Sequence, residues 1–154
     1  YKKLGVDTLY NKDYIIISKN KNINLPKKLD LDLSDSPDLA QTIAVSCLGL
    51  GIDCRLSGLH TLKIKETDRI EALKKEFLKL GIKNIETSDN TIYFEGNQKI
   101  NNNIKIATYQ DHRMALSFSA LAVIIDISIE SPNVVSKSFP GYWENLKTLG
   151  FKIN

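Results

Sequence analysis

An internal repeat limits the folds open to this chain more than any other feature of its sequence. Among the Leu-Gly-apolar tripeptides of the chain, those at residues 4–6, 80–82 and 149–151 recur at long intervals, of 76 and 69 residues. After each of the first two copies come a β-rich stretch, a polar Asn/Lys-rich connection, a helix, a strand and a lysine-led segment that enters another helix. The repeat predicts two copies of one supersecondary unit, residues 4–81 and 80–154.

Helix and strand signals alternate within each copy. Ser36 is a good N-cap and Pro37 suits a first helical position, so the apolar segment 40–50 is predicted to be a buried helix. Apolar residues recur at helical spacing over 70–80 and again from residue 111, which predicts two further helices. Strands are expected at 13–18, 54–59, 90–95 and 126–130. Strands that alternate with amphipathic helices predict an α/β layer architecture.

Composition and charge exclude several classes of protein. Of 154 residues, 42% are hydrophobic and 25% charged, which excludes a disordered tail or a disulfide scaffold. No apolar run is long enough to cross a bilayer and no signal peptide is visible, so we expect a cytoplasmic protein without membrane contact. The net charge of +3 is mild and unclustered, which argues against a nucleic-acid partner. Cys47 and Cys54 form no metal-binding pattern and are expected to be free, buried thiols.

Charged residues stand at the openings of the predicted buried helices. Helix N-termini carry free N–H groups and a partial positive charge, so they are natural anion sites. A carboxylate such as Asp38 should be held ionised there and suits a base, with simple helix capping as the alternative. Arg113, in the sequence Asp111-His112-Arg113, opposes the helix dipole, which favours an anionic partner for it.

Two lysine-led segments complete the charged set. Lys65, Glu66 and Arg69 fall within one turn, and we expect Lys65 and Arg69 to share one helical face as a clamp for phosphate or carboxylate. Lys137 precedes an aromatic segment that could anchor the loop presenting it. Surface ion pairs and a solvated lysine are the alternatives. Taken together, the charges predict one site for a polyanionic substrate, with no metal-binding set and no serine nucleophile.

Four short motifs resemble the late motifs of one enzyme family. Residues 65–69 (KETDR), 109–115 (YQDHRMA), 36–38 (SPD) and 137–140 (KSFP) are similar to those of the 5-enolpyruvylshikimate-3-phosphate (EPSP) synthases, in the same order and spacing. The resemblance implies an α/β (α+β) fold of βαβαββ repeats around buried helices, in a two-domain inside-out α/β barrel. Residues 1–154 would be the C-terminal part of one domain, about two repeats, with the N-terminal part of the enzyme absent.

The resemblance also implies a reaction. EPSP synthases transfer the enolpyruvyl group of phosphoenolpyruvate to the 5-hydroxyl of shikimate 3-phosphate, release phosphate and need no cofactor. The reaction belongs to the shikimate pathway, and the full enzyme is expected to be a cytoplasmic monomer. A UDP-N-acetylglucosamine enolpyruvyl transferase shares the fold and is a weaker match. A non-catalytic anion-binding domain on the same scaffold is the other alternative.

The resemblance assigns expected roles to individual residues. Asp38 matches the proton acceptor for the 5-hydroxyl, and Glu66 matches a proton donor or shuttle at the enolpyruvyl methylene. Lys65 matches a lysine at the shikimate 3-phosphate site that also takes part in proton transfer. The cations that match the phosphoenolpyruvate-binding cluster are Arg69, Arg113 and Lys137.

Two departures from the family pattern are visible. Some members have an Asn in contact with shikimate phosphate where this chain has Thr61. The family's other cationic ligands, and the serines that hold the 3-phosphate, have no counterpart here. We therefore expect no turnover by the 154 residues alone.

Overall fold

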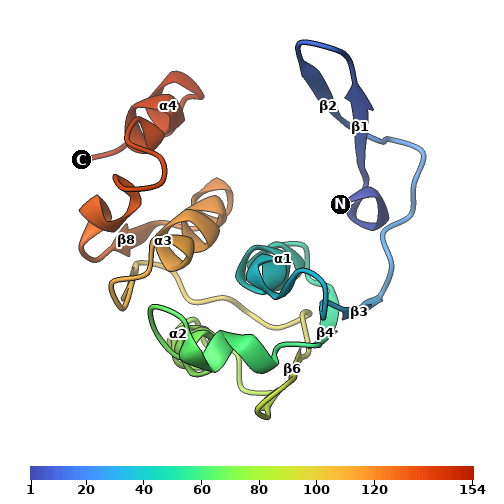
Figure 1. Ribbon diagram of the computed structural model, residues 1–154, viewed down its shortest axis with the longest axis vertical. Helices are drawn as coiled ribbons and strands as arrows, with labels where there is room; N and C mark the ends of the chain where they lie inside the picture. The colour runs from blue at the N-terminus through green and yellow to red at the C-terminus, as the bar shows by residue number, and fades with distance from the viewer.

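The middle of the chain forms one βαβαββ unit, seen in a computed structural model that describes residues 1–154 (Figure 1). The unit comprises β3 (Lys28–Asp32), α1 (Ala40–Gly49), β4 (Asp53–Ser57), α2 (Arg69–Lys79), β5 (Ile85–Thr87) and β6 (Ile92–Phe94). Its four strands lie in the order β3-β4-β6-β5, with β3 parallel to β4 and the other pairs antiparallel. The mixed helix–sheet class and the expected order of elements are confirmed.

Parts of equivalent units flank this one. Before it, β1 (Val6–Tyr10) and β2 (Ile15–Lys19) form an antiparallel hairpin that corresponds to β5–β6. After it, β7 (Ile104–Ile106), α3 (His112–Ser119), β8 (Ile127–Ile129) and α4 (Tyr142–Thr148) repeat the order β-α-β-α, with β7 parallel to β8. Both units predicted from the sequence, 4–81 and 80–154, begin just before a hairpin. In the central unit, however, the hairpin β5–β6 pairs with β4, so it belongs to the same sheet as the strands that precede it in the chain.

The repeated Leu-Gly tripeptide ends a helical segment at each of the three positions 4–6, 80–82 and 149–151. Gly5 follows a 3-10 turn, Gly81 follows α2 and Gly150 follows α4. Their φ angles are 80°, 93° and 96°, which is the left-handed conformation that glycine adopts without steric cost at a helix C-terminus. The most visible repeat of the sequence is therefore a repeated helix stop.

The four predicted strands match β2, β4, β6 and β8, but four other strands were not anticipated. The unanticipated strands are β1, β3, β5 and β7. The sequence Lys28-Leu29-Asp30-Leu31-Asp32 does alternate, and Leu29 is buried while both aspartates face outward. Its partner β4 lies beyond α1, so pairing across the helix selects the strand conformation.

A single apolar core joins the three helices that carry the site. Its 26 buried residues include most of α1, which accounts for that helix's nearly all-apolar sequence. The Phe77 ring meets Phe94 at 4.9 Å and Phe118 at 5.9 Å, both edge-on, and so ties α2 to β6 and α3. Cys47 and Cys54 are free and buried, as expected. None of the helices has the length and apolar character needed to cross a bilayer.

Candidate active site

The site forms where the starts of α1, α2 and α3 meet. Asp38 precedes α1 in a 3-10 turn, Pro37–Leu39, and Arg69 is the first residue of α2. Pro37 takes the first position of the turn as predicted, but the Ser36 side chain makes no capping hydrogen bond and α1 itself begins at Ala40. Since the three segments share the core described above, their charged ends are held at fixed positions.

Arg69 is the centre of this arrangement. Its Nε donates to Asp111 Oδ2 at 2.6 Å, one terminal nitrogen donates to Asp38 Oδ1 at 2.7 Å and the other to Glu66 Oε2 at 2.8 Å. The Arg69 side chain is only 2% exposed. A buried guanidinium is stable only when hydrogen-bonded anions surround it, and here three carboxylates do so. In this structure the buried Arg69 therefore holds the three carboxylates in place.

Asp111 is the member of the site that our sequence reasoning did not single out. It is fully buried, and besides Arg69 it accepts a hydrogen bond from the Arg113 backbone N–H at 2.8 Å as the N-cap of α3. A capping Asp directly before an apolar helix is a recognisable signal. Its second role, as counter-ion to a residue of another helix, has no signal in the local sequence.

Asp38 faces three cations. Lys65 Nζ lies 3.4 Å from Asp38 Oδ1, and an Arg113 terminal nitrogen lies 3.4 Å from Oδ2. Burial acts to raise the pKa of the Asp38 carboxyl, but attraction by Arg113, then Arg69 and Lys65, holds that pKa below its usual value. Asp38 is therefore ionised at neutral pH, in the state that a proton acceptor needs.

Lys65 and Arg69 do not share a helical face, so that expectation was wrong. Asp68 caps α2 by accepting from the Glu71 backbone N–H at 3.0 Å, which places the helix start after Lys65. Lys65 has an extended backbone instead. The two cations still meet, because both bind the same oxygen of Asp38.

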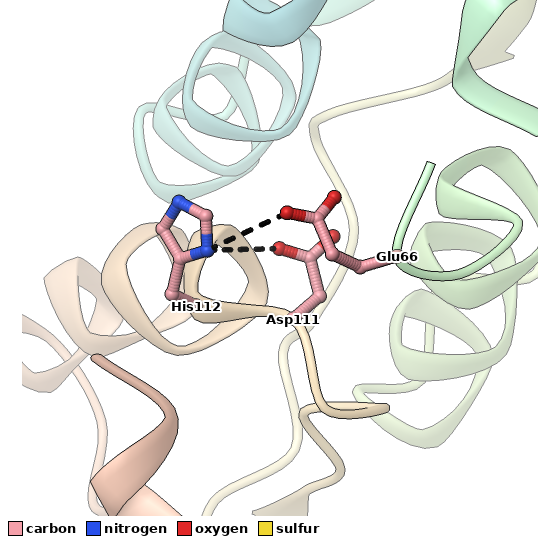
Figure 2. A group of neighbouring side chains, drawn as sticks. All are labelled: Glu66, Asp111 and His112. Atoms are coloured by element: carbon pink, nitrogen blue, oxygen red, sulfur yellow. Dashed lines mark ion pairs between the residues drawn. The ribbon is translucent and has the colours of Figure 1, made fainter. Parts of the chain in front are cut away.

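Glu66, Asp111 and His112 form the other side of the site (Figure 2). His112 Nδ1 lies 3.9 Å from Glu66 Oε1 and 3.8 Å from Asp111 Oδ1, and this buried nitrogen has no hydrogen-bond partner. Burial is the main reason that the pKa of His112 is lowered; Asp111 and Glu66 act to raise it, and Lys137 and Arg113 act to lower it. The imidazole is therefore neutral at pH 7.

These same three residues carry enough ligand atoms for a metal ion, all within 4.8 Å of one another, a grouping that the sequence alone did not reveal. Their surroundings do not suit a cation. Both Asp111 oxygens already accept hydrogen bonds from Arg69, and Oδ1 also accepts from the Arg113 amide. Lys137 Nζ lies 3.9 Å from Glu66 Oε1, which adds a further positive charge. The carboxylates of this group are therefore already neutralised by neighbouring cations and N–H donors.

The structure thus brings all six predicted site residues into one place. They are Asp38, Lys65, Glu66, Arg69, Arg113 and Lys137. Arg69 is internally neutralised, whereas the side chains of Lys65 and Arg113 are each 34% exposed and that of Lys137 is 57% exposed. Three solvent-facing cations around two partly exposed carboxylates can hold an anionic substrate and move protons on it.

Comparison with known proteins agrees with this geometry. The sequence matches the family of EPSP synthase (3-phosphoshikimate 1-carboxyvinyltransferase) over residues 1–146. The chain belongs to the EPSP synthase family. A 3-phosphoshikimate 1-carboxyvinyltransferase of Bacteroides fragilis is 44% identical over 155 aligned residues, and one of Neisseria meningitidis is 32% identical over 148. These alignments cover 99% and 96% of the chain.

The fold is also that of a solved EPSP synthase. The enzyme from Acinetobacter baumannii superposes with a TM-score of 0.78 at 24% identity over 99% of this chain. The chain spans 37% of the length of the Bacteroides relative and 38% of the Acinetobacter structure. The described residues therefore correspond to a little over a third of such an EPSP synthase.

Arg55 and Thr61 lie apart from the charged cluster. Arg55 pairs with Asp30 at 3.6 Å on the open face of the four-stranded sheet, and both side chains are about half exposed. Thr61 lies in the 3-10 turn His60–Ile64, where its buried hydroxyl has no hydrogen-bond partner.

Proposed function

We propose that this chain supplies part of an active site that transfers the enolpyruvyl group of phosphoenolpyruvate to the 5-hydroxyl of shikimate 3-phosphate. The carrying observation is the cluster of Asp38 and Glu66 with three solvent-facing cations at the meeting of three helix starts. Both substrates are polyanions, and such preorganised charge is often the largest contribution to catalysis. The family and the relatives' names support this substrate pair.

The cations have distinct tasks in this proposal. Arg113 and Lys137 bind the carboxylate and phosphate of phosphoenolpyruvate from the solvent side, and the planar fork of Arg113 suits a bidentate contact. Arg69 is buried and neutralised by carboxylates, and it fixes the positions of Asp38, Glu66 and Asp111 through hydrogen bonds. Lys65, next to Asp38, contacts shikimate 3-phosphate beside the reacting hydroxyl.

Asp38 and Glu66 carry the protons. Asp38 accepts the proton of the 5-hydroxyl as that oxygen bonds to C2 of phosphoenolpyruvate, while Glu66 shuttles a proton to C3, which gives a tetrahedral intermediate. Return of a C3 proton to Glu66 re-forms the double bond, and the C2–O bond to phosphate breaks. The proton held by Asp38 leaves with phosphate. No cofactor is needed because every step is a proton transfer, an addition or an elimination.

The chain alone does not complete this site. It spans 37% of the length of the Bacteroides relative, so the remaining ligands for shikimate 3-phosphate come from the part of the enzyme that these residues do not include. We propose that the complete enzyme is a cytoplasmic monomer and that residues 1–154 supply about two repeats of one of its two domains.

A chimera tests the function. Residues 1–154 replace the aligned C-terminal part of the Bacteroides fragilis relative, and phosphate release from phosphoenolpyruvate is measured with shikimate 3-phosphate as acceptor. We expect turnover by the chimera and none by the 154 residues alone. Asp38→Ala should abolish turnover without preventing phosphoenolpyruvate binding.

Three results would contradict the proposal. Turnover with UDP-N-acetylglucosamine in place of shikimate 3-phosphate would assign the sister reaction. An unchanged rate after Asp38→Ala would show that Asp38 is not the base, and only an anion-binding role would remain for this cluster. Normal activity of the isolated chain would contradict the proposal that the rest of the enzyme supplies part of the active site.

A further inference from the structure

We propose that Glu76 and Tyr109 are positioning residues for the cation cluster, acting through the turn that leads into α3. The proposal rests on the proposed function for its kinetic readout. Neither side chain belongs to the charged cluster, yet both belong to the same two elements, α2 and the segment before α3, that supply Arg69 and Asp111.

Glu76 is a fully buried carboxylate with no part in the proton transfers. Its Oε1 accepts the Tyr109 hydroxyl at 2.7 Å, and its Oε2 accepts the Ala107 backbone N–H at 3.2 Å and pairs with Lys79. Burial first, and then the bond to Glu76, raises the pKa of Tyr109, so its hydroxyl stays a donor at neutral pH. A buried acid with this many partners holds a specific loop conformation.

The loop that it holds is strained. Tyr109 and Gln110 have φ angles of 53° and 59°, so two consecutive residues other than glycine lie in the left-handed region. The turn closes with the Asp111 N–H donating to the Thr108 carbonyl at 2.9 Å. Turns with positive φ at both central positions favour Gly and Asn, which Tyr and Gln replace here. Such a conformation persists only where surrounding contacts enforce it.

Helix α2 enforces it from both ends. Arg69 and Glu76 are seven residues apart, which places them on one face roughly 10 Å from each other. Glu76 holds Tyr109 at one end of the turn, and Arg69 holds Asp111 at the other. Asp111 in turn caps α3 through the Arg113 N–H. The Tyr109 hydroxyl therefore sets where α3 begins, and with it the position of the Arg113 guanidinium.

Removing that hydroxyl tests the proposal in the chimera. Tyr109→Phe should raise KM for phosphoenolpyruvate about three- to tenfold and leave kcat within about twofold. Adding Gln110→Gly should return KM to within about twofold of the parent, because glycine adopts the left-handed conformation without strain. The matched control is Tyr93→Phe, whose side chain stacks under Lys28 on the outer sheet face, and it should leave KM unchanged.

A second readout separates positioning from turnover. Amide hydrogen exchange over residues 111–115 of the chimera should be at least about fivefold faster in Tyr109→Phe and recover with Gln110→Gly. An inactive parent chimera would overturn the proposed function, but the exchange experiment would still test the positioning role because it does not depend on turnover. Unchanged exchange overturns the positioning role whatever the activity. An unchanged KM in an active chimera overturns it as well, as does a raised KM that glycine does not restore.

Discussion

Replacing Arg69 with methionine is the most direct test of the charged cluster. Methionine keeps the apolar stem and removes the guanidinium, so three carboxylates lose their shared counter-ion. Asp38 and Glu66 are 40% and 34% exposed, so water compensates for much of their loss. Asp111 is fully buried, and its charge would remain without a partner.

The cost follows from that buried carboxylate. Breaking a buried pair by deleting one partner typically costs about 3–5 kcal/mol, against a total stability of about 5–15 kcal/mol for a domain. Urea unfolding of the chain, followed by the fluorescence of its one tryptophan, Trp143, and by circular dichroism, should show a loss of about 3–5 kcal/mol. Adding Asp111→Asn should recover at least half, because the amide oxygen still caps α3 and the charge is gone.

A control lies in the same helix. Lys75 pairs with Glu71 at 3.6 Å with both side chains about half exposed, so Lys75→Met should cost under about 0.5 kcal/mol. The reasoning would be refuted if Arg69→Met cost as little as the control, or if the double variant were no more stable than Arg69→Met alone.

Three further predictions concern single residues of the site. Asp38→Asn in the chimera should lower kcat about 10²- to 10⁴-fold in phosphate-release assays. Because the pKa of Asp38 lies below its usual value, the loss of rate caused by protonation of this carboxylate should appear only below about pH 4 in the parent. The pKa of His112 is lowered, so the folded state favours the neutral ring, and the protein becomes less stable as pH falls below about 6.5. In urea titrations, the His112→Asn variant should therefore lose less stability between about pH 7.5 and pH 5 than the parent does. Lys137→Met should raise KM for phosphoenolpyruvate about tenfold with unchanged unfolding, since the lysine side chain is 57% exposed.

The sequence predicted much of the local structure and the charged residues that the fold brings together. The stop signals, the helical periodicities and four of the strands depend on neighbours a few residues apart, so they are visible without a fold. The six charged residues were identified by type, position at helix openings and resemblance. The structure adds Asp111, which stands next to His112 and was noted only as part of a motif.

Contacts between distant residues were not predictable in this way. Arg69 binds Asp38 from 31 residues away and Asp111 from 42 residues away, and no periodic pattern links those positions. The same is true of β3, which becomes a strand by pairing with β4 across α1. Lys65 was misplaced because the Asp68 cap, rather than the charge spacing, decides where α2 begins.

By itself, then, the sequence determined the repeat, the order of helices and the family, and it identified the charged residues that the fold gathers into one cluster. Only the tertiary structure decided which of those charges are buried and which are exposed. Arg69 is buried among carboxylates, while Arg113, Lys65 and Lys137 face solvent. The physical reason is burial, which is a property of the assembled core. A guanidinium removed from water must be neutralised by its neighbours, and an exposed one remains free to bind substrate.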